Sequence, residues 1–297
     1  MTDEEETISQ VPSVSVVIPA RNIAEWLPAQ LEALSAQTYE GPLEVVVVLD
    51  ESSTDGTNEV MRAWELSHPQ FRSVVAPASG GIGQARNIGA LHSSGALMLC
   101  CDGDDVADEG WVAGMVATAQ SYEIFGGRLD YTRLGRTATS RSELQRDGLT
   151  TALGWRPWAC GVSLGIWRRT FDQLCGFNED YRRCEDVEFS WRAVDSGLAL
   201  GFAPDAVMSY RQRGDMRSSL RQGYSDATWF PRLYRDFRAS GMPRQTIGLA
   251  VRQWSKLIIA MPPSLFSAHR RGRWLRVFAQ MLGQVRGSVR YRVFWPA

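Results

Sequence analysis

The chain has 297 residues, of which 44% are hydrophobic and 22% charged, as in soluble globular proteins. This length suffices for one large α/β domain, or for one domain with an appendage. No apolar run approaches the roughly 18 residues of a membrane-spanning helix. The acidic start, MTDEEET, is the opposite of a signal peptide, and the five cysteines show no CxxC spacing. We therefore predict a cytoplasmic protein with reduced cysteines, whose residues 1–12 are a disordered acidic segment.

The net charge of −1 conceals an uneven distribution. Residues 241–297 contain ten basic residues and no Asp or Glu, so the remainder carries 33 acidic against 22 basic residues, a net charge of −11. Such a split indicates a basic segment that meets an anionic surface.

Short β-branched runs alternate with helical patterns in the first third of the chain. The predicted strands are 14–18, 43–49, 71–76 and 96–101, and the predicted helices are 25–36, one ending near 67, and 83–92. The strands are continuously apolar and the links are short. This pattern predicts a parallel sheet covered on both faces by helices.

The regular alternation ends after residue 126. The later expectations are a polar mobile loop at 128–150, a pocket wall at 155–165, helices at 169–174 and 185–196, a strand near Leu200, and helices at 218–240 and 244–260. Pro262 and Pro263 are expected to end the last helix.

Polar residues follow three of the predicted strands directly, at 19–22, 50–53 and 102–105. Ligands of parallel α/β sheets bind beyond the carboxyl ends of the strands. We therefore expect the three clusters to share one crevice, which is a more specific indication than any single motif.

The third cluster, CDGDD, places three carboxylates within four positions at the end of an apolar run. Asp102 and Asp104 can converge on one cation through a turn at Gly103. Carboxylate oxygens suit Mg²⁺ or Mn²⁺, which keep open positions for phosphate oxygens. The alternative is a solvated acidic turn that caps a helix beginning near Asp108.

Five motifs, VSVVIPARN, LDESSTDGT, GIGQARNIG, CDGDD and RRCEDVEFSWRAVDSG, occur in order. Together they resemble the family 2 glycosyltransferases of the GT-A fold, over roughly residues 12–225. The resemblance implies a Rossmann-like, mostly parallel sheet with flanking helices. It places the GT-A domain at 13–225, with a nucleotide-binding half at 13–127 and an acceptor half at 128–225. Residues 226–297 would then form a basic, amphipathic helical region.

The resemblance also implies which residues hold the nucleotide-sugar. Asp50 and Glu51 stand where the family has two aspartates that accept hydrogen bonds from base and ribose. Arg21 stands where a tyrosine often lies beside the base, and a guanidinium can stack likewise. The predicted nucleotide site comprises Pro19, Ala20, Arg21, Asn22, Asp50, Glu51, Ser53, Gly83, Arg86, Asn87, Asp102 and Gly103. Alternatively, Asp50 and Ser53 cap the following helix.

Asp102 and Asp104 match the D-x-D pair of the family, which implies a bound Mn²⁺ or Mg²⁺. Asp186 stands at the position of the catalytic base, which would take the proton of an acceptor hydroxyl in a single inverting displacement. The helix N-terminus and nearby Arg182, Arg183 and Arg192 are expected to keep Asp186 ionised.

One departure concerns the metal shell, because Tyr210 stands where the family often has a histidine. Arg211, Arg213 and Arg217 could instead neutralise the diphosphate, or form a solvated basic face. The predicted sugar or acceptor residues are Asp105, Trp158, Glu185, Arg211 and Arg217. Trp155 and Trp167 are further candidates for stacking on a sugar, although aromatic residues more often belong to a core.

The resulting prediction is an inverting glycosyltransferase that moves a sugar from a nucleotide-diphosphate donor, with UDP favoured, to a hydroxyl of a glycan or lipid-linked acceptor. It implies a role in cell-envelope or polysaccharide synthesis and no nucleic-acid partner. A nucleotidyltransferase is an alternative, but residues 19–22 lack the glycine-rich loop it would need. A degenerate nucleotide-sugar-binding scaffold is a third possibility.

The basic C-terminal region interleaves arginines with apolar and aromatic residues, which describes an interfacial helix rather than a spanning one. It predicts peripheral attachment to the inner face of an anionic cytoplasmic membrane. The alternative is that these helices pack on the catalytic domain or form a homodimer.

Overall fold

The computed structural model describes residues 11–78, 80–134, 144–212, 216–265 and 267–296. The first elements are β1 (Val14–Ala20), α1 (Leu27–Ser35), β2 (Leu43–Asp50), α2 (Thr57–Glu65), β3 (Phe71–Ala76), α3 (Ile82–Leu91) and β4 (Leu97–Cys101). Next come β5 (Val106–Ala107), α4 (Trp111–Ala119), β6 (Ile124–Asp130), β7 (Thr150–Ala152), β8 (Arg156–Trp158), β9 (Ser163–Trp167), α5 (Arg168–Gln173), α6 (Glu185–Asp195) and β10 (Leu200–Ser209). The C-terminal elements are α7 (Met216–Ala227), α8 (Phe230–Phe237), the 3-10 turn η1 (Arg238–Ser240), α9 (Ile247–Leu265) and α10 (Ala268–Tyr291).

The strands up to β10, except β7 and β8, form one sheet in the order β3-β2-β1-β4-β9-β6-β10-β5. Strands β1 to β4 run parallel, and β10 runs parallel to β6. Strand β9 lies antiparallel between β4 and β6. The predicted mostly parallel α/β sheet is therefore confirmed, while the antiparallel strand at its centre was not predicted.

The parallel strands are buried on both faces, as their continuous apolar sequences predict. Successive residues of β1 point to opposite sides. Val16 packs into the cluster that contains α1, α2 and α4, whereas Val17 packs into the one with α3, α5 and α6. The two helical layers fix the sheet and hold the loops at its carboxyl ends.

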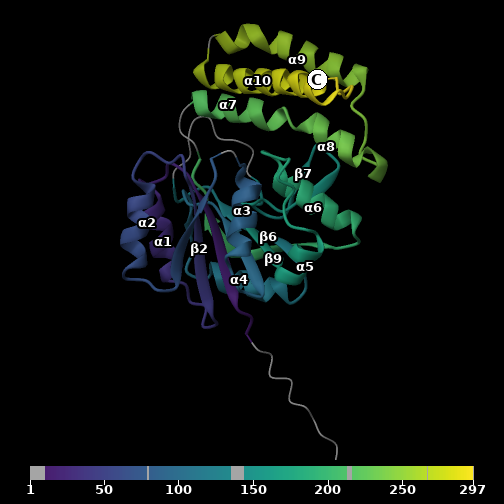
Figure 1. The fold of residues 1–297 in the computed structure, drawn as a ribbon. Helices are drawn as coiled ribbons and strands as arrows, with labels where there is room; N and C mark the ends of the chain where they lie inside the picture. Colours follow the sequence, from purple (N-terminus) through teal and green to yellow (C-terminus); the bar gives the residue numbers. More distant parts are fainter. Residues whose placement is uncertain (1–10, 79, 135–143, 213–215, 266, 297) are drawn as a thin grey trace, which may run out of the picture.

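The C-terminal helices form a layer above the α/β domain, with α9 farthest from it (Figure 1). The chain enters β1 at the opposite end, so the carboxyl ends of the parallel strands face this layer (Figure 1). Helix α10 lies against α7 and α8 through glycines: a Cβ added at Gly283 would stand 2.3 Å from the Tyr224 carbonyl oxygen. Among the described residues, no helix is both long and apolar enough to span a bilayer.

Some boundaries differ from the predictions. Strand β6 continues to Asp130 and β7 begins at Thr150, inside the predicted loop 128–150. The expected helix over 218–240 is divided into α7, α8 and η1. Helix α9 passes through Pro262 and Pro263 and ends at Leu265. The fixed φ of proline is compatible with a helix, and the missing N–H groups of these two residues interrupt hydrogen bonds only near its end.

Two predictions on domain organisation stay open. The boundary placed after residue 225 falls within α7, which joins the helical layer from Met216 onward. The disordered segment predicted over 1–12 falls almost entirely outside the described residues, as do 135–143 of the predicted loop.

Candidate active site

The carboxyl ends of β1 to β4 and the start of α3 enclose a pocket of about 320 Å³. Seven of the predicted donor or metal residues line it: Pro19, Ala20, Arg21, Asp50, Asp102, Gly103 and Asp104. Its wall also contains Gly81 and Ile82 at the start of α3, and Arg182 and Arg183 from the loop before α6. The polar ends of three strands thus meet in one cavity.

Arg21 and Asp50 form one side of this pocket, with 3.8 Å between Arg21 Nε and Asp50 Oδ2. The backbone N–H of Ser52 donates to Asp50 Oδ1 at 2.8 Å. This contact fixes the carboxylate at the mouth of β2, where it can accept further hydrogen bonds.

Asn22, Glu51 and Ser53 hold the surrounding loops instead of lining the pocket. Asn22, at φ 51°, accepts a hydrogen bond from the Thr54 N–H at 2.8 Å, and its own N–H donates to Ser53 Oγ at 3.3 Å. Glu51 Oε1 accepts from the Ala78 N–H at 3.0 Å. These residues therefore set the shape of the pocket from outside it.

Asp102, Asp104 and Asp105 bring one carboxylate oxygen each to within 4.8 Å of one another. Asp105 is buried, and its Oδ2 has no hydrogen-bond partner. Burial, followed by the charges of Asp104 and Asp102, raises the pKa of Asp105 well above its ordinary value. An orphaned oxygen among mutually repelling carboxylates fits a bound divalent cation, with Asp105 behind the pocket and the other two in its wall.

Arg211 closes the far side of this acidic cluster. Its N–H donates to Asp105 Oδ1 at 2.6 Å, and its Nε donates to the Asp104 carbonyl oxygen at 2.7 Å. Tyr210 lies edge-on to Tyr131, with 5.4 Å between the ring centroids. Arg217 is exposed on α7, and Arg213 is outside the described residues.

Asp186 stands in the first turn of α6, after Cys184 turns the chain at φ 59°. Asp186 Oδ2 accepts from the Gly161 N–H at 3.0 Å, and Oδ1 accepts from the Val187 N–H at 2.9 Å. Burial raises the pKa of Asp186, while the Arg86 guanidinium and these two N–H groups lower it. The net effect is a carboxylate that accepts a proton more readily than an exposed aspartate.

Arg86 joins the acidic cluster to α6. Its side chain is only 2% exposed; Nη1 donates to Glu185 Oε1 at 2.7 Å and Nη2 donates to Asp102 Oδ1 at 3.4 Å. Burial and the neighbouring Asp186 raise the pKa of Glu185 to about 7, although Arg86 lowers it. Arg86 was predicted as a nucleotide contact, but it lies behind the pocket, between its acidic wall and α6.

The expectation that Arg183 and Arg192 keep Asp186 ionised needs correction, because both pair with other carboxylates. Arg192 Nε pairs with Glu188 Oε1 at 2.9 Å, one turn further along α6. Arg183 lies 3.8 Å from Asp226. The cation that acts on Asp186 is Arg86, from a helix about 100 residues earlier, which sequence proximity could not indicate.

Gly83, Gly161 and the side-chain amide of Asn87 complete the contact between α3 and the segment around α6. A Cβ on Gly161 would stand 2.3 Å from Arg86 Nη2, and one on Gly83 would stand 3.2 Å from Glu185 Cγ. Asn87 Nδ2 donates to the Phe177 carbonyl at 2.9 Å, and its Oδ1 accepts from the Phe177 N–H at 2.9 Å. Asn87 thus positions the loop before α6, and Gly161 is a residue that sequence reasoning missed.

The tryptophans lie apart from the pocket. Trp155 packs edge-on against Trp191 with 4.9 Å between the ring centroids, within an aromatic core that α6 shares with α8 and the C-terminal residues. Trp167 pairs with Leu97 at the opposite end of β4, so its assignment as a sugar platform is wrong. Trp158 is half-buried beside the aromatic core and does not line the pocket, and its acceptor role stays a prediction.

Comparison with known proteins agrees with this geometry. The sequence model of glycosyl transferase family 2 matches residues 15–171, and the chain therefore belongs to this family. It is 30% identical over 203 residues to Glycosyltransferase AglE of Haloferax volcanii, covering 67% of each chain.

Two solved structures share the fold. One is the mannosyltransferase PcManGT from Pyrobaculum calidifontis in complex with GDP-Man and Mn²⁺, with a TM-score of 0.62 and 19% identity, covering 92% of this chain and 87% of that one. The other is S. aureus TarS 1-349 in complex with UDP-GlcNAc, with a TM-score of 0.52 and 15% identity, covering 95% and 93%. The chain is therefore a glycosyltransferase of the GT-A kind.

Proposed function

We propose that this chain is an inverting, metal-dependent transferase that moves a sugar from a nucleotide-diphosphate donor to a hydroxyl acceptor. The observation that carries the proposal is the buried Arg86 bridge, which ties the acidic wall of the nucleotide pocket to the helix that bears Asp186. It sets donor-binding and proton-accepting carboxylates in a fixed relation, as a single displacement requires.

The pocket suits a nucleoside diphosphate. Asp50 and Arg21 can contact the base and ribose, since one accepts hydrogen bonds and the other can stack on a flat ring. The N–H groups at the start of α3 and the nearby Arg182 favour the anionic diphosphate. We favour UDP as the nucleotide, and one fold neighbour binds UDP-GlcNAc while another binds GDP-Man.

Asp102 and Asp104 would hold Mn²⁺ or Mg²⁺, with Asp105 supporting them from behind. A bound ion of this kind offsets negative charge on the leaving diphosphate and orients it. The orphaned oxygen of Asp105 and the repulsion within the cluster both support a cation at this point.

Asp186 would take the proton of the acceptor hydroxyl while the oxygen of that hydroxyl attacks the anomeric carbon of the donor sugar. The bond from that carbon to the diphosphate breaks in the same step, which inverts the configuration. The Gly161 and Val187 N–H groups hold the carboxylate in place, and its raised pKa increases its affinity for the proton. Membership of the family favours this function over a nucleotidyltransferase.

Two measurements test the proposal. Proton NMR of a product made from an α-linked donor should show a β-glycoside, and an α-glycoside would refute inversion. Titration calorimetry should show that Asp104→Ala loses Mn²⁺-dependent UDP affinity while keeping its fold, since the change relieves repulsion in the free protein. Unchanged affinity would contradict the assignment of the metal site.

A hydrolysis assay with nucleotide-sugars and Mn²⁺ separates the enzyme from an inactive scaffold, because a scaffold would hydrolyse none of them.

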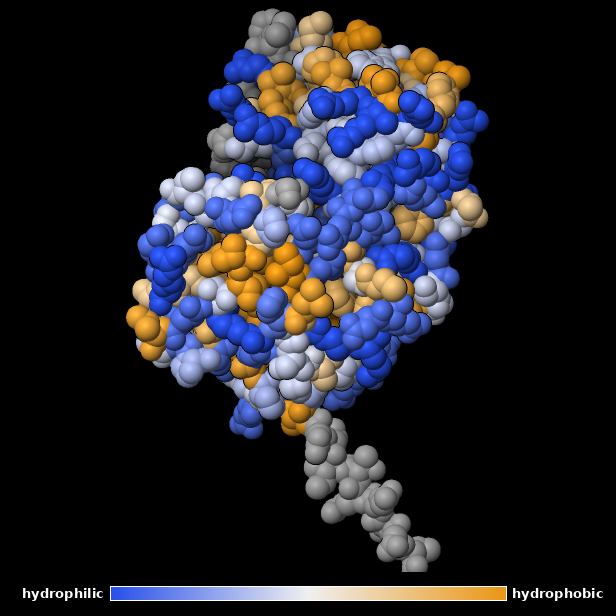
Figure 2. Space-filling view, in the orientation of Figure 1, coloured by the Kyte–Doolittle hydropathy of each residue, from blue (hydrophilic) through white to orange (hydrophobic). Residues whose placement is uncertain are grey.

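We further infer that α9 attaches the enzyme to an anionic membrane surface, near a lipid-linked or envelope acceptor. Ile247, Val251 and Ile258, which are 62%, 58% and 65% exposed, share one face of α9, and Ile259 is 73% exposed beside them. Figure 2 shows hydrophobic and hydrophilic residues side by side at the top of the molecule, where the C-terminal helices lie, and the charged residues of α9 are Arg252 and Lys256. Each basic residue near an anionic surface contributes about 1 kcal/mol.

Liposome flotation tests this attachment. The full chain should float with anionic vesicles at low salt and less so at high salt, and Ile258→Glu should weaken flotation without unfolding an exposed position. Failure of the full chain to float would exclude membrane attachment. A homodimer would appear instead as a doubled mass in sedimentation, which Ile258→Glu would halve.

A further inference from the structure

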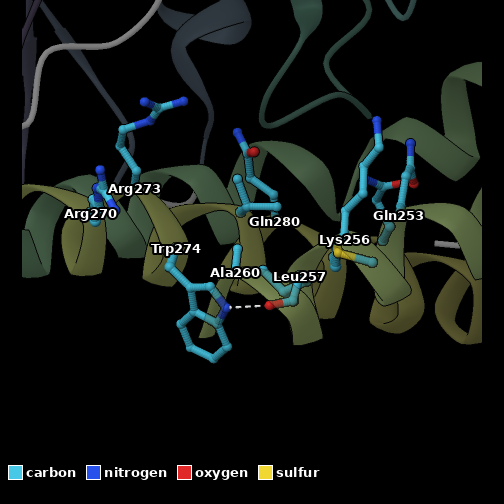
Figure 3. A pocket seen from close by; sticks show the side chains of 11 residues that line it. Gln253, Lys256, Leu257, Ala260, Arg270, Arg273, Trp274 and Gln280 are labelled. Atoms are coloured by element: carbon cyan, nitrogen blue, oxygen red, sulfur yellow. Dashed lines mark hydrogen bonds between the residues drawn. The ribbon is translucent and has the colours of Figure 1, made fainter. Parts of the chain in front are cut away.

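A second cavity, of about 660 Å³, lies between α9 and α10, away from the nucleotide pocket. Its rim contains three cationic side chains, those of Lys256, Arg270 and Arg273. In Figure 3, Lys256 and Arg273 extend to the same side of the two helices, the side on which segments of the α/β domain are drawn. Lys256 and Arg273 therefore place positive charge along one edge of the cavity.

The charge at this rim is not neutralised within the described chain. Residues 241–297 contain no acidic side chain, and none of the ion pairs among the described residues involves Lys256, Arg270 or Arg273. The amides of Gln253 and Gln280 extend to the same side as the cations (Figure 3). Three cations and two neutral donors without an acid are suited to an anion with several oxygen atoms.

The inner wall of the cavity is apolar. Leu257 is buried, and the Trp274 indole N–H donates to its carbonyl oxygen at 2.7 Å, which fixes the tryptophan between the helices. The Trp274 ring stacks on Phe278 with 5.2 Å between centroids. Val277 remains half-exposed in the cavity wall. Such a wall gains free energy by covering a hydrocarbon chain, at about 25 cal/mol for each Å² removed from water.

We propose that the cavity between α9 and α10 binds a phosphate-bearing amphiphile, with the phosphate at Lys256, Arg270 and Arg273 and the hydrocarbon chain along Leu257, Trp274 and Val277. Phosphate matches the rim because arginine can engage two of its oxygens at once. The apolar wall distinguishes this ligand from a free phosphate ion. The phosphate can come from a bilayer lipid or from a soluble molecule that carries an apolar group.

The first experiment uses octyl phosphate as the probe, with the full chain and titration calorimetry. No donor and no metal are added, so the result does not depend on the proposed glycosyl transfer. Octyl phosphate should bind with one site per chain, and more tightly than either inorganic phosphate or octanol. Absence of binding would overturn the proposal, as would inorganic phosphate binding equally well.

The second experiment separates the cavity from general positive charge. Arg270→Gln with Arg273→Gln should weaken octyl phosphate binding by about tenfold or more, since hydrogen bonds between charged groups are the strong ones. Arg252→Gln with Arg271→Gln removes two charges of the same hairpin outside the cavity and should leave binding unchanged. An equal loss in both pairs would overturn the proposal.

Ala260→Glu provides a variant with little risk to folding, because Ala260 is exposed in α9 and glutamate forms helices well. The new carboxylate faces the rim and should abolish octyl phosphate binding; retained affinity would contradict the site. Phosphatidylcholine vesicles with and without phosphatidic acid then identify the source. Loss of vesicle binding in the cavity variants assigns the site to a bilayer lipid, and retention assigns it to a soluble ligand.

Discussion

Replacing Arg86 with methionine should destabilise the fold strongly, because it leaves the buried carboxylate of Glu185 without its partner. Arg86 and Glu185 are 2% and 4% exposed, and 2.7 Å separates their charged atoms. Removing one member of such a pair costs about 3–5 kcal/mol. With an unfolding entropy of about 2.1 cal/mol/K for each residue, that loss corresponds to a fall in Tm of about 5–8 °C in a chain of 297 residues.

Thermal unfolding of Arg86→Met, Glu185→Met and the double variant forms a double-mutant cycle. The double variant should recover most of the loss, since well-packed apolar residues can replace a buried ion pair at little cost. The pKa of Glu185 is about 7 with Arg86 present and rises further without it. The loss in Arg86→Met should therefore be smaller at about pH 5, where the carboxyl is neutral, than at about pH 8. A loss below about 1 kcal/mol, or no recovery in the double variant, would refute the pairing.

Three further predictions concern catalysis. Asp186→Asn should lower kcat by about 10²- to 10⁴-fold with unchanged donor affinity, and near-normal turnover would place the base elsewhere. Gly161→Ala should lower both Tm and kcat because its Cβ meets Arg86, whereas Gly110→Ala, with nothing within 4 Å, should not. Because burial raises the pKa of Asp186 above 3.8, kcat/KM should fall as the pH drops through that raised value; a profile flat down to the ordinary range of an aspartate would contradict the assignment.

The sequence was informative where local pattern determines structure. The apolar strands and their polar ends predicted the sheet, and Asp50, Asp102 and Asp104 do line one pocket. This follows because parallel strands bring their carboxyl ends to one edge. The sequence of β9 contains no feature that predicts its antiparallel direction, since its apolar residues are equally compatible with parallel and antiparallel pairing.

Long-range contacts were the part that the sequence could not predict. The expectation for Asp186 relied on arginines nearby in the chain, whereas the effective cation comes from α3. Gly161 looked like one small residue among several, because the need for glycine arises only from Arg86 packing against it. The sequence left open whether Trp155 and Trp167 stack on a sugar or belong to a core for the same reason: their surroundings depend on the sheet order and on α6.

The buried bridge also constrains how this chain can vary. Arg86 needs an acidic residue at 185 to balance its charge and a glycine at 161 to leave space for its guanidinium group. The absence of a side chain at Gly83 leaves space for Glu185. Substitution at one of these four positions is therefore tolerated best when the others change with it. Relatives that have lost the arginine should be free to carry larger residues at the position of Gly161, so the four positions should covary although they come from three separate segments.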